Sequence, residues 1–144
     1  MTGPCSEERN WAPDGEAAVV TDIPVRAVDG AAAHKASADG VGAVVVGGDF
    51  QALGIVRSLG RRGVRVCVVD DEPSISRFSR YCTFSERVAD LRDERGAIQT
   101  LLDVGARLDL RGWVLFATRD ENVAALSRHA DTLREQYRVP VAPW

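Results

Sequence analysis

The feature that most constrains this chain is a short apolar run that ends at two adjacent glycines. Residues 43–46 are small or β-branched, and Gly47 and Gly48 follow them at once. The next apolar residues stand at helical spacing, at Ala52, Leu53, Val56 and Leu59. This order is typical of a buried parallel strand that turns sharply into a helix. We therefore predict a strand at about 43–47 and a helix at about 50–61, with a glycine loop between them that lets a ligand approach the backbone.

The same alternation of strand and helix recurs along the rest of the chain. Apolar runs predict further strands at 64–69, 83–88 and 113–117, helical spacing predicts a helix at 93–106, and 137–144 reads as an extended segment. A last helix should follow 118–121, where Thr118 and Glu121 have the spacing of a capping box before the apolar positions Val123, Leu126 and Leu133. Strands that alternate with helices pair in parallel. The predicted fold is an α/β, Rossmann-like sheet of four to five strands in the order 3-2-1-4, flanked by helices.

The charges divide the chain into two parts. Residues 1–42 carry seven acidic and three basic residues, whereas residues 43–144 carry fourteen and fifteen. The first part mixes Gly, Pro, Ala, Asp and Glu without a lasting period, which predicts a disordered acidic leader at 1–42 and a folded domain at 43–144. Brief edge strands at 17–21 and 25–28 are the alternative for the leader.

Composition also bears on partners and location. The net charge of -3 gives no reason to expect nucleic acid as a partner. No apolar run approaches the roughly 20 residues of a membrane helix, and the N-terminus does not resemble a signal peptide, so we expect a cytoplasmic protein without a membrane partner. The three cysteines form no CxxC pair, and Cys67 reads as a small core residue.

Three loops should meet at the carboxyl edge of the sheet, where the strand order reverses between the first and fourth strands. They are the glycine loop at 47–48, the loop at 70–82 and the turn at 118–121. Two arginines and two serines at 76–82 of the second loop could hold a carboxylate or a phosphate, or the loop could be solvated with Phe78 and Tyr81 packed down. Asp120 and Glu121 complement a helix dipole whether or not they bind a ligand. His129 is expected on a helix surface.

A nucleotide site is the first functional possibility. Gly47, Gly48 and Gly54, with Asp70 at the end of the second strand, partly match a dinucleotide fingerprint, but the glycine spacing differs from Gly-x-Gly-x-x-Gly. No Gly-Lys-Ser/Thr motif occurs, and Lys35 is the only lysine of the chain. A phosphate-binding P-loop is therefore excluded.

Several short motifs occur together in a recognisable order. They are Val-Val-Gly-Gly-Asp-Phe-Gln-Ala-Leu-Gly-Ile-Val-Arg-Ser-Leu-Gly-Arg-Arg-Gly-Val, Val-Asp after the second strand, Ser-Arg-Tyr, Ala-Thr-Arg-Asp-Glu, Leu-Ser-Arg-His and Val-Pro-Val-Ala-Pro-Trp. Over residues 43–144 the chain resembles the N-terminal, pre-ATP-grasp domain of ATP-grasp carboxylate-amine ligases. In that family this domain helps to bind the substrate, and the following domains bind ATP and magnesium for amide-bond formation through an acyl phosphate.

The resemblance implies a set of substrate-facing positions in this chain. They are Gly47, Gly48, Asp49, Asp70, Ser79, Arg80, Thr118, Asp120 and Glu121. The sequence departs from the family because it stops where the ATP-binding domain would begin. We therefore expect a truncated lobe that is inactive alone, binds a small carboxylate or amino-acid substrate, and is completed, if at all, by a chain carrying the ATP-grasp domain. The alternatives are a stand-alone nucleotide- or dinucleotide-binding module and a non-catalytic interaction protein that self-associates.

Overall fold

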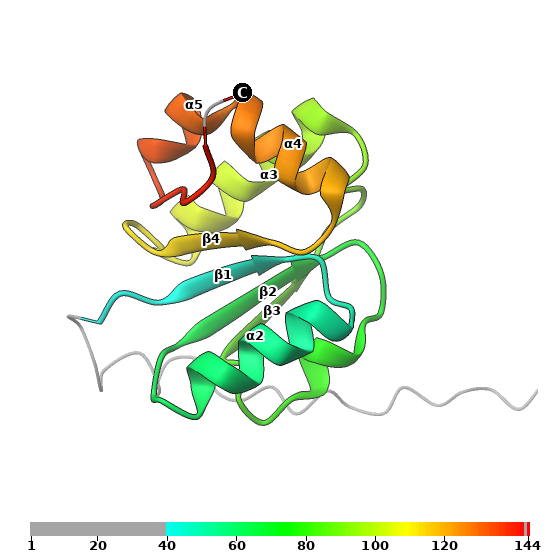
Figure 1. The fold of residues 1–144 in the computed structure, drawn as a ribbon, viewed down its shortest axis with the longest axis vertical. Helices are drawn as coiled ribbons and strands as arrows, with labels where there is room; N and C mark the ends of the chain where they lie inside the picture. The colour runs from blue at the N-terminus through cyan, green and yellow to red at the C-terminus, as the bar shows by residue number, and fades with distance from the viewer. Residues whose placement is uncertain (1–39, 143) are drawn as a thin grey trace, which may run out of the picture. The chain divides into compact units, whose positions relative to one another are not determined.

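Four strands form a parallel sheet in the computed structural model, which describes residues 40–142 and 144 (Figure 1). They are β1 (Ala43–Val46), β2 (Val66–Asp70), β3 (Phe84–Arg87) and β4 (Val114–Ala117). The order is β3-β2-β1-β4, and every pairing is parallel. The predicted Rossmann-like α/β fold and its strand order are confirmed.

Most of the acidic leader predicted at 1–42 lies outside the described residues, together with the two edge strands suggested within it. Within residues 40–142 and 144, no helix combines the length and the apolar character needed to cross a membrane.

The two central strands are buried on both faces because helices cover the sheet from both sides. Val44 and Val46 point to one face and Val45 to the other, and none of the three is more than 1% exposed. Helix α2 (Phe50–Gly60) covers the Val45 face with Ala52 and Val56. Figure 1 shows α3 (Glu94–Arg107), α4 (Asp120–Arg128) and α5 (Ala130–Arg134) on the opposite face. Both central strands therefore need apolar residues at successive positions, because alternate side chains enter the cores on opposite faces.

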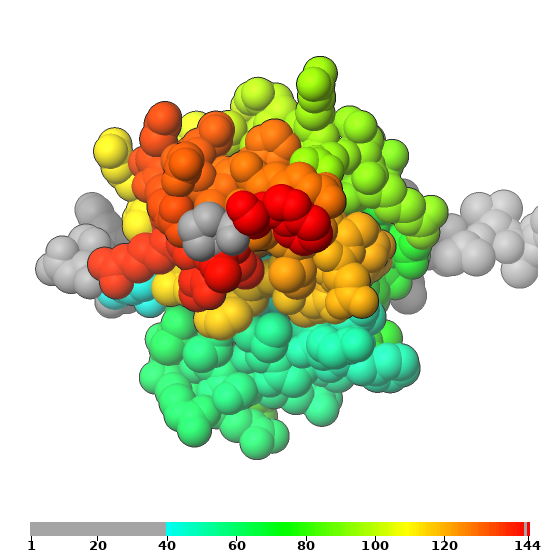
Figure 2. Space-filling model, turned by 45° about the horizontal axis from the view of Figure 1, so that its top comes forward, coloured from blue at the N-terminus to red at the C-terminus, as the bar shows by residue number. Residues whose placement is uncertain are grey.

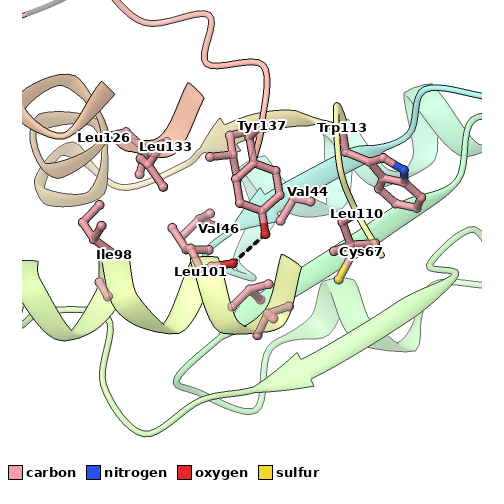
Figure 3. Packing of buried hydrophobic residues seen from close by; sticks show 14 of the residues in the cluster. Val44, Val46, Cys67, Ile98, Leu101, Leu110, Trp113, Leu126, Leu133 and Tyr137 are labelled. Carbon is pink, nitrogen blue, oxygen red and sulfur yellow. Dashed lines mark hydrogen bonds between the residues drawn. The ribbon is translucent and has the colours of Figure 1, made fainter. Parts of the chain in front are cut away.

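The larger half of the core lies between the sheet and the three helices α3 to α5 (Figure 3). Leu101 on α3 is fully buried there, and its carbonyl accepts a hydrogen bond of 2.6 Å from the hydroxyl of the buried Tyr137. Cys67, predicted as a core residue, is fully buried in the same cluster, and burial raises the pKa of its thiol. This cluster anchors the residues that follow α5 to the helix layer.

The segment after α5 makes one bridge to the sheet and forms no fifth strand within the described residues. The Arg138 amide donates to the Trp113 carbonyl at 2.8 Å, and the Arg138 carbonyl accepts from the Leu115 amide at 2.9 Å. These bonds cover one end of the outer edge of β4. The sheet therefore has four strands, the lower of the two numbers predicted.

The helix predicted to run from the 118–121 turn through Leu133 is broken at His129. Helix α4 ends at Arg128 and α5 begins at Ala130, with His129 between them at φ -106° and ψ 21°. Leu126 and Leu133 enter the same buried cluster from the two sides of the break. The His129 side chain is half-buried, with Nε2 3.0 Å from Oε1 of Glu94 on α3. Its predicted place on a free helix surface is therefore wrong.

Candidate functional site

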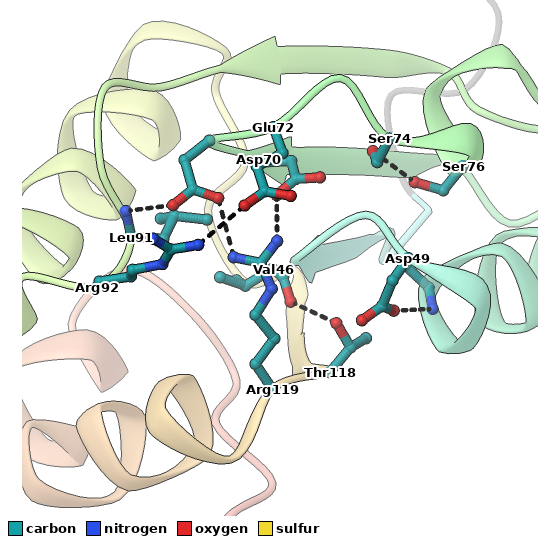
Figure 4. Close-up of polar contacts among 12 residues, drawn as sticks. Val46, Asp49, Asp70, Glu72, Ser74, Ser76, Leu91, Arg92, Thr118 and Arg119 are labelled. Atoms are coloured by element: carbon teal, nitrogen blue, oxygen red, sulfur yellow. Dashed lines mark hydrogen bonds and ion pairs between the residues drawn. The ribbon is translucent and has the colours of Figure 1, made fainter. Parts of the chain in front are cut away.

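The glycine loop after β1 is enclosed by the two neighbouring loops at the carboxyl edge of the sheet (Figure 4). Gly47 has φ +90°, a conformation that other residues rarely adopt, and a β-carbon there would collide with Thr118. A β-carbon on Gly48 would overlap the side chains of Ser74 and Asp70. Both glycines are needed for this packing, which brings together the three loops that the sequence predicted would meet.

Backbone and side-chain hydrogen bonds join the glycine loop to its neighbours. The Thr118 hydroxyl donates to the Val46 carbonyl at 3.1 Å, and the Ser76 amide donates to the Gly48 carbonyl at 3.3 Å. Because its hydroxyl is used in this way, Thr118 does not cap the following helix. Arg119 occupies the N-cap of α4 and makes no side-chain cap bond, so the predicted capping box is wrong.

Arg119 connects the loop after β4 to the loop after β2. One terminal nitrogen lies 3.1 Å from Oδ1 of Asp70, and the other lies 2.9 Å from Oδ1 of Asp71. The side chains are 17%, 5% and 8% exposed respectively, so this cluster is largely shielded from solvent. Its charge-assisted bonds therefore fix the positions of the two loops relative to each other.

The environment of this cluster favours the charged forms of Asp71 and Arg119. Burial by itself would raise the pKa of Asp71, but hydrogen bonds from the Arg119 guanidinium and the Leu91 amide outweigh it and hold that pKa below its ordinary value. Burial would likewise lower the pKa of Arg119, yet the bond to Asp71 and the nearby carboxylates raise it. The two residues form a stable ion pair.

Asp70 is only partly satisfied by this pair. Its Oδ1 accepts from Arg119, whereas its Oδ2 is buried and has no hydrogen-bond partner among the described residues. Gly48 and Ser74 pack close to this carboxylate. The carboxylate is therefore packed against the neighbouring loops. An acid that binds a ribose needs a carboxylate that is open to the ligand.

A cavity of about 280 Å³ opens beside these loops. Its polar lining comes from Asp49, Asp70, Glu72, Ser74 and Arg119, and its apolar lining comes from Phe50, Pro73 and Ile75. Three carboxylates therefore face one guanidinium that is already paired. The cavity carries an excess of negative charge.

The N-terminus of α2 points at this cavity and already has its own anion. Asp49 is the N-cap residue, and its Oδ1 accepts from the Ala52 amide at 3.4 Å. A helix N-terminus attracts anionic ligands through its free amide groups and its dipole. In this chain the Asp49 carboxylate occupies the position that an anionic ligand would take.

Exposed apolar side chains line the cavity and the short helix beside it. Phe50 is 80% exposed and Ile75 is 44% exposed, and both line the cavity. Phe78, on the short helix η1 (Ile75–Phe78) with Ile75, is 73% exposed. The interpretation that Phe78 packs down is wrong, because only Tyr81 joins the core below α2.

The structure brings together some of the predicted site residues and not others. Gly47, Gly48, Asp49, Asp70 and Thr118 gather at the carboxyl edge. Ser79 ends η1, and Arg80 donates to the hydroxyl of its neighbour Tyr81 at 2.6 Å; neither lines the cavity. Asp120 and Glu121 are exposed on the first turn of α4, and Asp120 lines a different hollow.

Sequence reasoning missed the residue that joins the loops, Arg119. A signal was present, because a single arginine follows the fourth strand while three carboxylates follow the second. The carboxyl ends of parallel strands lie at the same edge of a sheet, so opposite charges that follow two such strands can pair there. Phe50 and Ile75, the exposed apolar residues that line the cavity, were also missed. Whether a side chain at the start of a helix is exposed depends on how the neighbouring loop packs against it, and the local sequence does not give that packing.

The comparisons with known proteins leave the family open. A scan against protein-family models finds no match for this chain, and a search of curated proteins finds none either. Within the described residues, no group of three or more His, Cys, Asp or Glu side chains is arranged to hold a metal ion.

Proposed function

We propose that residues 43–144 act as the substrate-binding lobe of an ATP-grasp carboxylate-amine ligase and bind the amino group of a small substrate. The lobe is not catalytic alone, and a domain or chain that binds ATP and magnesium completes the reaction. The observation that carries the proposal is the acidic cavity at the carboxyl edge of β1 and β2, lined by Asp49, Asp70 and Glu72. It lies where ligands bind in open α/β sheets.

The charge of the cavity favours an ammonium group over an anion. Its one guanidinium, that of Arg119, is held by Asp70 and Asp71 and brings no free positive charge. Asp49 uses Oδ1 for its cap bond and Glu72 uses Oε1 for an exposed pair with Arg92, so each has a second carboxylate oxygen for a positive ligand. Phe50 and Ile75 supply apolar contacts for the rest of an amine or amino-acid substrate.

The same features oppose the alternative of a nucleotide-binding module. A pyrophosphate would have to displace the Asp49 carboxylate from the start of α2, and a ribose would have to reach an Asp70 side chain that is only 5% exposed. The triphosphate of ATP does not fit a cavity with three carboxylates, and no lysine occurs after Lys35 to neutralise it. ATP therefore belongs outside this cavity.

The apolar mouth of the cavity suits a second protein surface. Phe50, Ile75 and Phe78 are exposed together at the start of α2 and on η1. Apolar side chains exposed as a group often mark an interaction site. A domain or chain that carries the ATP site would cover them and close the cavity over the substrate.

Calorimetric titration of the full chain tests the proposal. The ligands are amino acids and primary amines on one side and ATP, NAD, NADP, FAD and AMP on the other. We expect saturable binding of an amine or amino acid and none of the nucleotides. Asp49→Asn should weaken the amine about tenfold, because Asn still caps the helix but removes a charge worth about 1.4 kcal/mol to the bound ammonium.

A matched control is available at the N-cap of α3. Asp93 caps that helix through a 2.7 Å bond from the Gly96 amide and does not line the cavity, so Asp93→Asn should leave amine binding unchanged. Nucleotide binding that Asp70→Ala abolishes would instead support the alternative. Hydrolysis of ATP by the pure chain with magnesium would contradict a lobe that is inactive alone.

A further inference from the structure

A second hollow lies on the outer side of α4, away from the sheet. Its volume is about 600 Å³, and it is lined by Asp120, Val123, Ala124 and Ser127 from α4 and by Val141, Ala142 and Trp144 from the C-terminal segment. Figure 2 shows the C-terminal residues, in red, on the surface beside α4, in orange. Known small-molecule pockets have volumes of about 300–1,000 Å³. We call this hollow the α4 groove.

Side-chain contacts hold the two walls of the α4 groove together. The Ser127 hydroxyl donates to the Ala142 carbonyl at 2.5 Å. The Arg128 guanidinium lies 4.7 Å from the ring centre of Trp144 and also pairs with Glu94 on α3 at 2.7 Å. The indole is therefore fixed by a cation–π contact whose cation is itself anchored.

The lining of the α4 groove is apolar except at one end. Val123 and Trp144 are 39% and 82% exposed, large values for apolar residues of a folded region. Ser127 has its hydroxyl engaged with the C-terminal segment. Among the described residues of the lining, Asp120 alone carries a charged side chain, and it stands on the first turn of α4.

This distribution defines the ligand that the groove would accept. Seven residues of α-helix separate Asp120 from Ser127, which corresponds to about 10 Å along the groove. A matching ligand has one positive charge at one end and an apolar body of about that length. An uncharged ligand would leave the charge of Asp120 unused, and an anion would be repelled by it.

We propose that the α4 groove is a binding site for a hydrophobic primary amine, with the ammonium group at Asp120 and the apolar body against Val123, Ala124 and the indole of Trp144. This site is separate from the cavity at the sheet edge, since the two share no lining residue. Its occupancy does not depend on the function proposed above.

The fluorescence of Trp144 gives a direct readout of binding in the full chain. The probe is phenylbutylamine, and phenylbutanol and phenylbutyrate are its uncharged and anionic counterparts. We expect a saturable change in emission with the amine, and weaker binding of the alcohol and the acid. The change should disappear in Trp144→Phe, because Trp113, the other tryptophan among the described residues, does not line the groove.

Two substitutions separate the charge from the apolar wall. Asp120→Asn should weaken the amine about three- to fivefold, as expected for an exposed ion pair, and should leave the alcohol unaffected. Ala124→Leu places a larger side chain in the groove and should weaken all three probes more than about tenfold. Binding to these two variants is followed by calorimetry as well as fluorescence.

The controls make the same chemical changes elsewhere. Asp131→Asn removes an exposed carboxylate from α5, and Ala106→Leu enlarges an exposed alanine on α3; both should bind the amine as the wild type does. Equal binding of amine, alcohol and acid would overturn the proposal, as would a wild-type protein that gives no saturable signal. A wild-type dimer that Ala124→Leu dissociates would also overturn it, because the groove would then be an interface between copies.

Discussion

Arg119 has the largest structural role of any single residue in the candidate site. Its guanidinium holds Asp70 and Asp71, whose positions in the sequence are 49 and 48 residues away. All three side chains are largely buried, and removing one partner from a buried ion pair leaves an uncompensated charge. The shape of the site therefore depends on this one side chain.

Replacing Arg119 should destabilise the protein strongly at neutral pH. Arg119→Ala leaves two carboxylates without their cation, and we expect a loss of about 3 kcal/mol in the free energy of unfolding. Chemical denaturation measures it. The control is Arg92→Ala, which breaks the exposed pair with Glu72 and should cost less than about 0.5 kcal/mol. Equal losses in both variants would contradict the role assigned to Arg119.

The loss in Arg119→Ala should also depend on pH. The folded-state pKa of Asp71 lies below its ordinary value of 3.8, so its contribution to stability is present above that value and lost as the pH falls through the folded pKa. The gap between the wild type and Arg119→Ala is therefore largest at neutral pH and narrows in acid below 3.8. Denaturation curves across this range check it, and a constant gap would rule out the linkage.

At the level of helices and strands, the sequence predicted the features that depend on local residue patterns. The continuous apolar runs of β1 and β2 indicated central strands, and the pairing order followed from strand–helix alternation. The break at His129 was missed because the His129 side chain contacts Glu94 on another helix. A contact between two helices does not appear in the local residue pattern. The predicted capping box was wrong for a similar reason, since Thr118 bonds to Val46 across the sheet edge.

The attachment of the segment after α5 to α3 rests on one buried hydroxyl. Tyr137→Phe removes the bond to the Leu101 carbonyl, and we expect a loss of about 1 kcal/mol in the free energy of unfolding. Tyr81→Phe is the control, because that hydroxyl bonds to the exposed Arg80, and its loss should be within about 0.5 kcal/mol. Thermal denaturation compares the two; a larger effect at Tyr81 would contradict the assignment.

At the scale of the described region, both helix layers rest on the same four strands. Val44 and Val45 are neighbours in one strand, yet they belong to clusters on opposite faces of the sheet. Neither layer can lose its packing without exposing strands that the other layer also needs. We therefore expect residues 40–142 to unfold as one cooperative unit.

A cavity made on one face should weaken protection on the other. Leu101→Ala, at a fully buried position of α3, should cost about 2–5 kcal/mol. Hydrogen exchange should then become faster in α2 by the same factor as in α3, although α2 lies across the sheet. Val123→Ala, at a position 39% exposed, should change neither rate by much. Faster exchange confined to α3 would show that the layers unfold separately.

The pairing of Arg119 with Asp70 and Asp71 also has a consequence for synthesis on the ribosome. The acidic loop emerges about 50 residues before the arginine that neutralises it, which is several seconds earlier at about 5–20 residues per second. Until translation passes position 119, the carboxylates of Asp70 and Asp71 lack the guanidinium that pairs with them in the fold. The order of residues along the chain thus makes the cavity at the sheet edge one of the last parts of the domain that can be completed.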